Sequence, residues 1–174
     1  KRQGPYAQMA GHDINYISIG GALGMIGDEH GKPVLPLNIV ADFAAGGLMM
    51  AFAVLLAVQA RERTGRGQDI DLAMSDGVTS LLGMQISRMF AAGNPPPQRG
   101  QHPLGGDRCF YNVYECADGG WVGVGAIEPY FFEALCKGLD LEEFIPHQHD
   151  DDRQPEMKAA FSATFKTKSR DQWF

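Results

Sequence analysis

The sequence has 174 residues, of which 44% are hydrophobic and 21% are charged, and its formal net charge is −6. This composition is typical of a globular chain with enough apolar surface to bury a core. Nucleic acids and anionic membranes bind clustered lysine and arginine, so the acidic balance argues against both partners. The three cysteines form no C-x-x-C pair and are odd in number, which argues against a secreted disulfide framework and favours an intracellular, cytoplasmic protein.

The ends of the sequence do not resemble natural termini. The chain starts with Lys1 instead of methionine, and the turn-like Gly4-Pro5 follows without the apolar run of a signal peptide. Trp173 and Phe174 come last, with no later residues to bury them. We therefore expect a piece of a longer protein.

The first predicted elements are two helices. Residues 12–26 form the first, and the polar residues 27–33 end it. Residues 36–63 form a long second helix that is apolar on nearly all sides, which predicts burial, and Thr64-Gly65-Arg66-Gly67 ends it. Its apolar run, residues 48–58, is shorter than the roughly 20 residues that span a membrane. Asp42 would also be costly in lipid.

The next residues indicate an α/β fold class. Residues 69–74 alternate apolar and polar side chains with the period of a strand, and a helix followed by a strand is typical of a doubly wound parallel sheet. Ser75 or Asp76 can cap a third helix that runs to about residue 92. Residues 93–97, which include three prolines, then predict an extended linker.

Beyond this linker the pattern becomes α+β, with a domain boundary expected near Gly105. Residues 109–116 and 121–126 are strand-like, and Ala117-Asp118-Gly119-Gly120 between them predicts a hairpin. Glu128-Pro129 begins a helix that runs to residue 137, because proline is tolerated in a first turn. Residues 157–165 form a further amphipathic helix.

His12 and Asp42 lie in runs that packing alone does not demand. His12 follows a glycine at a predicted helix start, where free N–H groups and the helix dipole favour an anion such as an enolate oxygen. Asp42 lies in an apolar helix, where burial of a carboxylate is energetically unfavourable unless it has a hydrogen-bonding partner or a catalytic role. Together they predict a two-base site. Alternatively, His12 caps a helix or lies in the core, and Asp42 pairs with Arg61 or Arg99.

Five runs resemble the alpha-methylacyl-CoA racemases, a group within the family III CoA transferases. The runs, in chain order, are GPYAQMAGHDINY (4–16), PLNIVADFAAGGLM (36–49), RTGRGQDIDLAM (63–74), QRGQ (98–101) and VGAIEPYFF (124–132). The resemblance covers nearly the whole chain and implies the central part of a longer protein that forms interlocked homodimers.

The resemblance also implies a division of the chain. Residues 1–74 correspond to a fragment of a large, Rossmann-like CoA-binding domain, with its helices and parallel-sheet strand. Residues 75–106 form a linker helix and a proline-rich connection. Residues 107–174 belong to a smaller α+β domain. Most partners of the CoA phosphates are implied to lie outside this chain.

A racemase that acts beside a thioester carbonyl removes one proton and returns another to the opposite face. Two acid/base groups on opposite sides achieve this. The ordinary pKa of histidine already suits this role. Aspartate needs its pKa raised, and an apolar setting in a buried helix would raise it by disfavouring the charged form. The resemblance assigns these roles to His12 and Asp42, and it gives Glu128 the role of orienting the His12 imidazole. Glu128 can also simply start its helix.

Three further residues are candidate substrate contacts. The resemblance implies that Asp13 offers its backbone N–H to the thioester oxygen and that Met74 lines the acyl path. The Asp13 carboxylate itself can complement the start of its own helix. Tyr16, one turn after His12, either lines the same cleft or packs in the core. We expect no metal and no cofactor, since coenzyme A is part of the substrate. His147, His149 and the adjacent aspartates favour a solvated loop over a metal site.

The sequence thus favours a racemase that interconverts R and S 2-methylacyl-CoA thioesters in fatty acid metabolism through an enolate. A family III CoA transferase, in which Asp42 is a nucleophile that forms a mixed anhydride, is the main alternative. His12 favours the racemase, because a nucleophilic aspartate needs no opposing base. A noncatalytic assembly fragment is a third possibility, and the isolated chain is expected to be inactive.

Overall fold

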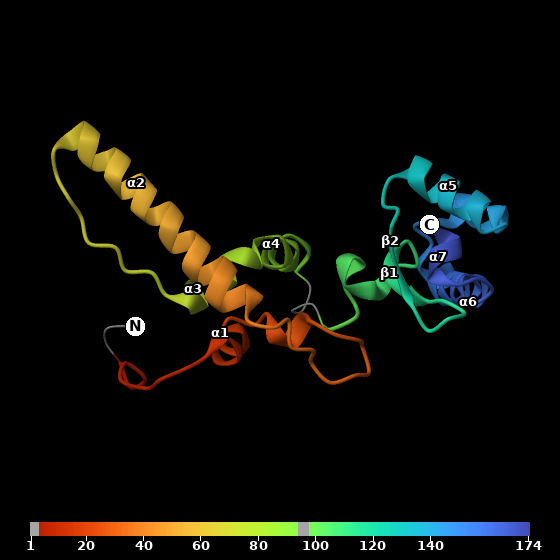
Figure 1. Ribbon diagram of the computed structural model, residues 1–174, viewed down its shortest axis with the longest axis horizontal. Coiled ribbons are helices and arrows are strands. Elements are labelled where there is room, and N and C mark those ends of the chain that lie inside the picture. Colours follow the sequence, from red (N-terminus) through yellow and green to blue (C-terminus); the bar gives the residue numbers. More distant parts are fainter. Residues whose placement is uncertain (1–3, 94–97) are drawn as a thin grey trace. The chain divides into compact units, whose positions relative to one another are not determined.

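The computed structural model describes residues 4–93 and 98–174 (Figure 1). These form two compact units: unit 1 is residues 1–27 with 31–99, and unit 2 is residues 28–30 with 100–174. Each unit has its own cluster of buried side chains. The division into residues 1–74, 75–106 and 107–174 stays a prediction, and residues 94–97 of the predicted linker lie outside the described residues.

Unit 1 is helical in its described part. Its α-helices are α1 (Asp13–Ile19), α2 (Met49–Thr64), α3 (Met74–Leu81) and α4 (Gly83–Ala92), with a 3-10 turn, η1 (Leu23–Met25), and a π-helix, η2 (Ile39–Leu48). The predicted first helix starts as expected but ends early, because Gly21 has a φ of 88° that breaks the helical path. Its small residues allow a close approach, since a Cβ at Gly20 would lie 2.5 Å from Val78 Cγ1.

The predicted long second helix is confirmed, with η2 continuing directly into α2 (Figure 1). It ends at Gly65, which adopts a left-handed φ of 70° and donates its N–H to the Arg61 carbonyl at 2.7 Å. The predicted burial is wrong within unit 1, because none of the described residues of α2 is buried. A uniformly apolar helix is buried only if other elements cover it, and the pattern of its own residues does not show whether they do.

The apolar helix is longer than the run of residues 48–58 expected from the sequence. Because η2 continues into α2, Ile39–Thr64 is one helix of 26 residues, which by length and composition is long and apolar enough to cross a membrane. Asp42 in its first turn would remain costly in lipid.

The predicted strand at residues 69–74 is wrong. Residues 66–73 have no regular structure, and Met74 already belongs to α3, whose N-cap is Ala73 and not Ser75 or Asp76. A strand needs a hydrogen-bonded neighbour, and the strands found in the described part of the chain pair only with each other. The predicted third helix also divides into α3 and α4 at Leu82. The fold is therefore mixed helix and sheet, without a parallel strand among the described residues.

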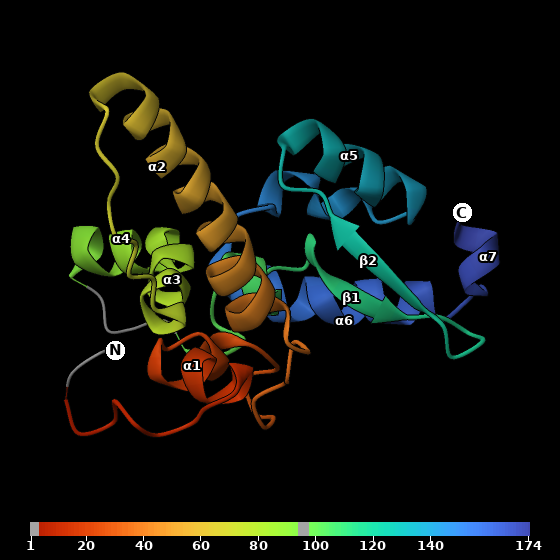
Figure 2. The same ribbon diagram turned by 60° about the vertical axis from the view of Figure 1, so that its left-hand side comes forward.

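Unit 2 contains the predicted hairpin. Strands β1 (Tyr111–Glu115) and β2 (Trp121–Gly125) pair antiparallel, with Tyr111 opposite Gly125. At the turn, Gly119 has a φ of 76°, and Asp118 Oδ1 accepts the Gly120 N–H at 3.0 Å. Figure 2 shows the hairpin beside α6, which packs on β1.

The predicted helices of unit 2 are also confirmed. Glu128 is the N-cap of α5 (Pro129–Gly138), and α6 spans Gln154–Phe165. The remaining elements are η3 (Pro103–Asp107), η4 (Glu142–His147), η5 (Asp151–Arg153) and α7 (Arg170–Trp173). Aromatic side chains dominate the core, where the rings of Tyr114 and Phe165 stack with centroids 5.0 Å apart. The Tyr114 hydroxyl donates to the Cys109 carbonyl at 2.6 Å, which satisfies its buried polar end.

Candidate functional site

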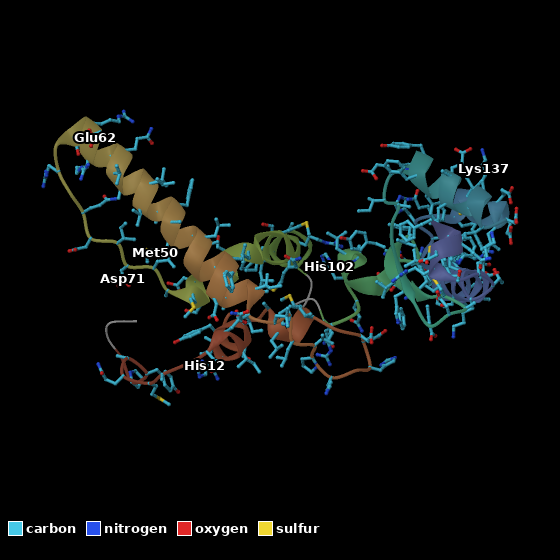
Figure 3. The ribbon with its side chains drawn as sticks, viewed as in Figure 1. His12, Met50, Glu62, Asp71, His102 and Lys137 are labelled. Carbon is cyan, nitrogen blue, oxygen red and sulfur yellow. The ribbon has the colours of Figure 1, made fainter. Side chains whose placement is uncertain are left out.

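His12 is held at the start of α1 as its N-cap residue. Its backbone N–H donates to Asn15 Oδ1 at 2.9 Å, and its carbonyl accepts the Asn15 N–H at 2.9 Å. These reciprocal bonds fix the backbone on both sides of the imidazole. The His12 side chain is exposed and projects from the beginning of the helix (Figure 3). The local geometry therefore presents an accessible imidazole from a rigid helix start.

Asp42 lies in the first turn of η2, and its side chain is exposed. The face of η2 that enters the core carries Ala41 and Ala45, so Asp42 projects away from this face. The Asn38 side-chain amide donates to Asp42 Oδ2 at 3.3 Å. The apolar setting that we expected for this carboxylate is therefore absent from the described part of unit 1.

The alternative partners of Asp42 make other contacts. Arg61 pairs with Glu62, with Nη2 and Oε1 2.8 Å apart. The guanidinium of Arg99 donates to the carbonyl oxygens of Gly24 at 3.3 Å and Gly31 at 2.6 Å, which ties two turns of unit 1 together. A structural ion pair is thus not what explains Asp42 at this position.

Asp13 connects the two candidate bases. Its side chain is only 5% exposed, and Oδ2 accepts the backbone N–H groups of Ala41 at 2.7 Å and Asp42 at 2.8 Å. The sequence suggested that this carboxylate complements its own helix, whereas it binds the free N–H groups at the start of η2. Because Asp13 directly follows His12 in the chain, its carboxylate links the segment that carries His12 to the backbone of Asp42. Sequence reasoning missed this contact because no local pattern identifies a partner so distant along the chain.

Tyr16 and Met74 lie in the same helical cluster. The Tyr16 ring covers the glycine before His12, because a Cβ at Gly11 would stand 3.0 Å from the Tyr16 hydroxyl oxygen. Met74 covers Gly46, where a Cβ would lie 3.1 Å from Met74 Cγ. Both side chains are also partly buried against the core of unit 1. The structure thus brings Tyr16 near His12 and Met74 near the helix of Asp42, while core packing accounts for part of each position.

Glu128 lies in unit 2, where it starts α5 and is exposed. Its carbonyl oxygen accepts the N–H groups of Phe131 and Phe132, each at 3.0 Å, so its place at the helix start is confirmed, although its side chain makes no hydrogen bond that caps α5. Its contact with His12 stays a prediction. A feature not foreseen is the buried Gln148, whose side-chain amide donates to the Ile127 carbonyl at 2.7 Å and fixes the residue before Glu128.

Gln148 is in turn held by a second buried glutamine. Gln154 Nε2 donates to the Gln148 carbonyl at 2.9 Å, and Gln154 Oε1 accepts the Cys109 N–H at 3.0 Å. Buried amides need hydrogen-bond partners, and neither of these two glutamines has a fully buried side-chain atom without one. The His-Gln-His run in an apparently solvated loop gave no signal for this network.

Two histidines and two cysteines of unit 2 have structural surroundings. His147 Nδ1 lies 3.5 Å from Asp150 Oδ2, and the His149 ring packs edge-on against Phe110. Within residues 4–93 and 98–174, no three histidine, cysteine or acidic side chains group as metal ligands. Burial raises the pKa of Cys109 to about 12 and that of Cys136 to about 11, so both thiols stay protonated at neutral pH.

Comparison with known proteins identifies the family. A model of CoA-transferase family III matches residues 1–174. A human protein named alpha-methylacyl-CoA racemase is 42% identical over 173 residues, which are 99% of this chain and 45% of the human protein. A succinyl-CoA:mesaconate CoA-transferase of Haloarcula marismortui is 32% identical over 140 residues, which are 79% of this chain and 34% of that protein.

A solved structure shows the same fold. The crystal structure of a CAIB/BAIF family protein from Brucella suis matches with a TM-score of 0.74 and 25% identity, over 98% of this chain and 46% of that one. The chain spans 45% of the length of the human relative. It belongs to CoA-transferase family III.

Proposed function

We propose that the complete protein containing this chain is an alpha-methylacyl-CoA racemase, which interconverts R and S 2-methylacyl-CoA thioesters by proton transfer through an enolate. The observation that carries the proposal is the contact of the Asp13 carboxylate with the Asp42 backbone N–H at 2.8 Å. It joins an exposed imidazole and an exposed carboxylate in one small helical cluster. The 42% identity to a protein named for this reaction supports the same assignment.

The proposed chemistry uses both bases, one after the other. One of His12 and Asp42 removes the proton from the carbon next to the thioester carbonyl, and the other returns a proton to the opposite face. The backbone N–H of Asp13, in the first turn of α1, stabilises the enolate oxygen between the two transfers. Acid/base groups alone move both protons, so the proposal needs no cofactor beyond the coenzyme A of the substrate.

Three residues complete the proposed site. Glu128 orients the His12 imidazole by holding its second nitrogen, as a base of this kind requires. Met74 lines the acyl path, where a flexible thioether adapts to different chains. Tyr16 lines the cleft beside His12.

A family III CoA transferase is the second candidate, and the exposure of Asp42 is what favours it. An accessible carboxylate can attack an acyl-CoA carbonyl and form a mixed anhydride. This mechanism leaves His12 without a role, whereas the racemase uses both groups. A noncatalytic assembly fragment is the third candidate.

The proposed protein acts inside the cell, as an interlocked homodimer, and binds neither nucleic acid nor membrane. The exposed apolar side chains of α2 support an assembled state, since Phe52, Leu55 and Leu56 would otherwise face water. The net charge of −6 supports the absence of a nucleic-acid partner.

Incubation of a 2-methylacyl-CoA in deuterated water with the complete protein tests the assignment. The racemase incorporates deuterium at the α carbon and yields both epimers. Unlabelled thioester, together with transfer of CoA to an added carboxylic acid, would instead identify the transferase. A protein with neither activity under conditions where it is folded would be assigned to the assembly role.

A further inference from the structure

We propose that Asp13 is a positioning residue, whose buried carboxylate sets the place of Asp42 relative to His12 and thereby controls inversion of the substrate more than removal of its proton. The inference rests on the proposed racemase function. It concerns the side chain of Asp13, which acts through Asp42, and it is separate from the role of the Asp13 backbone N–H at the thioester oxygen.

The start of η2 depends on Asp13 because its own N-cap residue does not cap it. Asn38 makes no side-chain cap to the helix and instead donates to Asp42 Oδ2. The first N–H groups of a helix have no partner within it, and Asp13 Oδ2 binds those of Ala41 and Asp42. Hydrogen bonds to an ionised carboxylate are roughly twice as strong as neutral ones. Asp13 is therefore the cap of η2, supplied from α1.

The remaining contacts between α1 and η2 are weakly directional. Ile17 of α1 shares a buried cluster with Ala41 and Ala45 of η2, and contacts between apolar side chains have no preferred direction. The segment before η2 also carries strain, since Leu37 has a φ of 57°. Without the Asp13 bonds, we expect the first turn of η2, which includes Asp42, to shift or fray.

The second oxygen of Asp13 shows that the carboxylate is not an ordinary core group. Oδ1 is buried and accepts no hydrogen bond from any described residue. A buried acceptor without a partner is unfavourable, and such groups concentrate where function requires them. It also makes asparagine an informative substitution. An asparagine side chain at this position could still accept both N–H groups, but it would lack the charge and would place an NH₂ group at the buried position of Oδ1.

The two steps of racemisation depend differently on this geometry. Exchange of the α-proton with solvent needs one base, whereas inversion needs both bases on opposite sides of the same carbon. A displacement of about 1 Å in a reacting group can lower a rate about 100-fold. Moving Asp42 should therefore reduce inversion while His12 still exchanges the proton of one epimer. Unfolding of part of the sample would reduce both rates equally.

The test uses the complete protein with Asp13→Ala, Asp13→Asn and, as a control, Asp69→Asn, which changes an exposed aspartate in the loop before α3. Each is incubated with one epimer at a time in deuterated water, and label and configuration are followed together. For the epimer that His12 deprotonates, the ratio of exchange to inversion should rise at least about 10-fold in Asp13→Ala. It should rise less in Asp13→Asn and stay unchanged in Asp69→Asn. Equal losses of both activities, or an unchanged ratio, would overturn the positioning role.

A second measurement separates this inference from the proposed function. Amide hydrogen exchange should show faster exchange at Ala41 and Asp42 in Asp13→Ala than in the parent, with little change at Val78 in the core. If the parent neither exchanges nor inverts the thioester, the racemase assignment fails, and with it the role in inversion. Unchanged protection at Ala41 and Asp42 would show that Asp13 does not hold η2, whatever reaction the protein performs.

Discussion

Gly77 lies directly against Ala45: a Cβ atom at position 77 would stand 2.5 Å from the Ala45 carbonyl oxygen and 2.8 Å from its Cβ. The two residues belong to α3 and η2, so these helices touch almost backbone to backbone. Only glycine permits this approach. The contact fixes the helix that carries Asp42 against the one that begins with Met74, which makes it a support of the candidate site.

Gly77→Ala should therefore destabilise unit 1 by about 1–3 kcal/mol, as overpacking of a tight core does. Chemical denaturation of the complete protein measures the change. Gly83→Ala is the matched control, because nothing lies within 4 Å of its Cβ position and alanine favours a helix more than glycine does. An equal effect of the two substitutions would contradict the close contact between α3 and η2.

His12→Ala and Asp42→Ala should each lower the epimerisation rate by roughly 10²–10⁴-fold, since each removes one positioned acid/base group. Each variant should still exchange the α-proton of one epimer through the remaining base, and the two variants should differ in which epimer it is. Chiral chromatography combined with mass spectrometry measures both quantities. Near-normal epimerisation in two folded variants would remove the two-base site.

The parts of the fold that the sequence predicted are those with local signals. Asp118-Gly119 marked the hairpin turn, Glu128-Pro129 marked the start of α5, and Gly65 marked the end of α2, because each determines the backbone of its own neighbourhood. Alternation at residues 69–74 gave a wrong strand, since it describes side chains and not the presence of a partner strand. Burial of the second helix was wrong for a similar reason, as it depends on what covers the helix.

The candidate site divides in the same way. The local sequence identified His12 and Asp42 as candidates, because a polar residue within an apolar segment is recognised from its sequence neighbours alone. The contact of Asp13 with Ala41 and Asp42 could not be predicted from the sequence, since it joins residues far apart in the chain. The carboxylate was expected to serve its own helix, which is the nearest local explanation.

Glu128→Gln should reduce epimerisation less than His12→Ala does, because the imidazole remains and only its orienting group changes. Glu133→Gln is the control: it lies on the same helix, is exposed, and pairs with Lys137, with Nζ and Oε1 2.6 Å apart. The values of kcat and KM for both epimers provide the comparison, with circular dichroism to show that α5 persists. If Glu128→Gln behaves as Glu133→Gln does, Glu128 is a helix-start residue only.

The buried thiols of unit 2 predict a loss of stability at high pH. Burial, the main cause, raises the pKa of Cys109 from 9.0 to about 12 and that of Cys136 from 9.0 to about 11. In the unfolded chain both thiols ionise near 9, whereas in the folded chain they stay neutral. Ionisation therefore favours unfolding as the pH rises above about 9, and the stabilisation present below this pH is lost progressively towards pH 11–12.

At pH 10 this effect should amount to about 1 kcal/mol for each thiol, since one pKa unit corresponds to about 1.4 kcal/mol. The free energy of unfolding of the complete protein, measured by chemical denaturation between about pH 7 and pH 10, should fall more steeply in the parent than in the double variant Cys109→Ala, Cys136→Ala. The double variant will be less stable at every pH, because it leaves space in the aromatic core, so the slope and not the absolute value is decisive. Parallel slopes would mean that the thiols also ionise freely in the folded protein, which is incompatible with the burial of Cys109 and Cys136 described above.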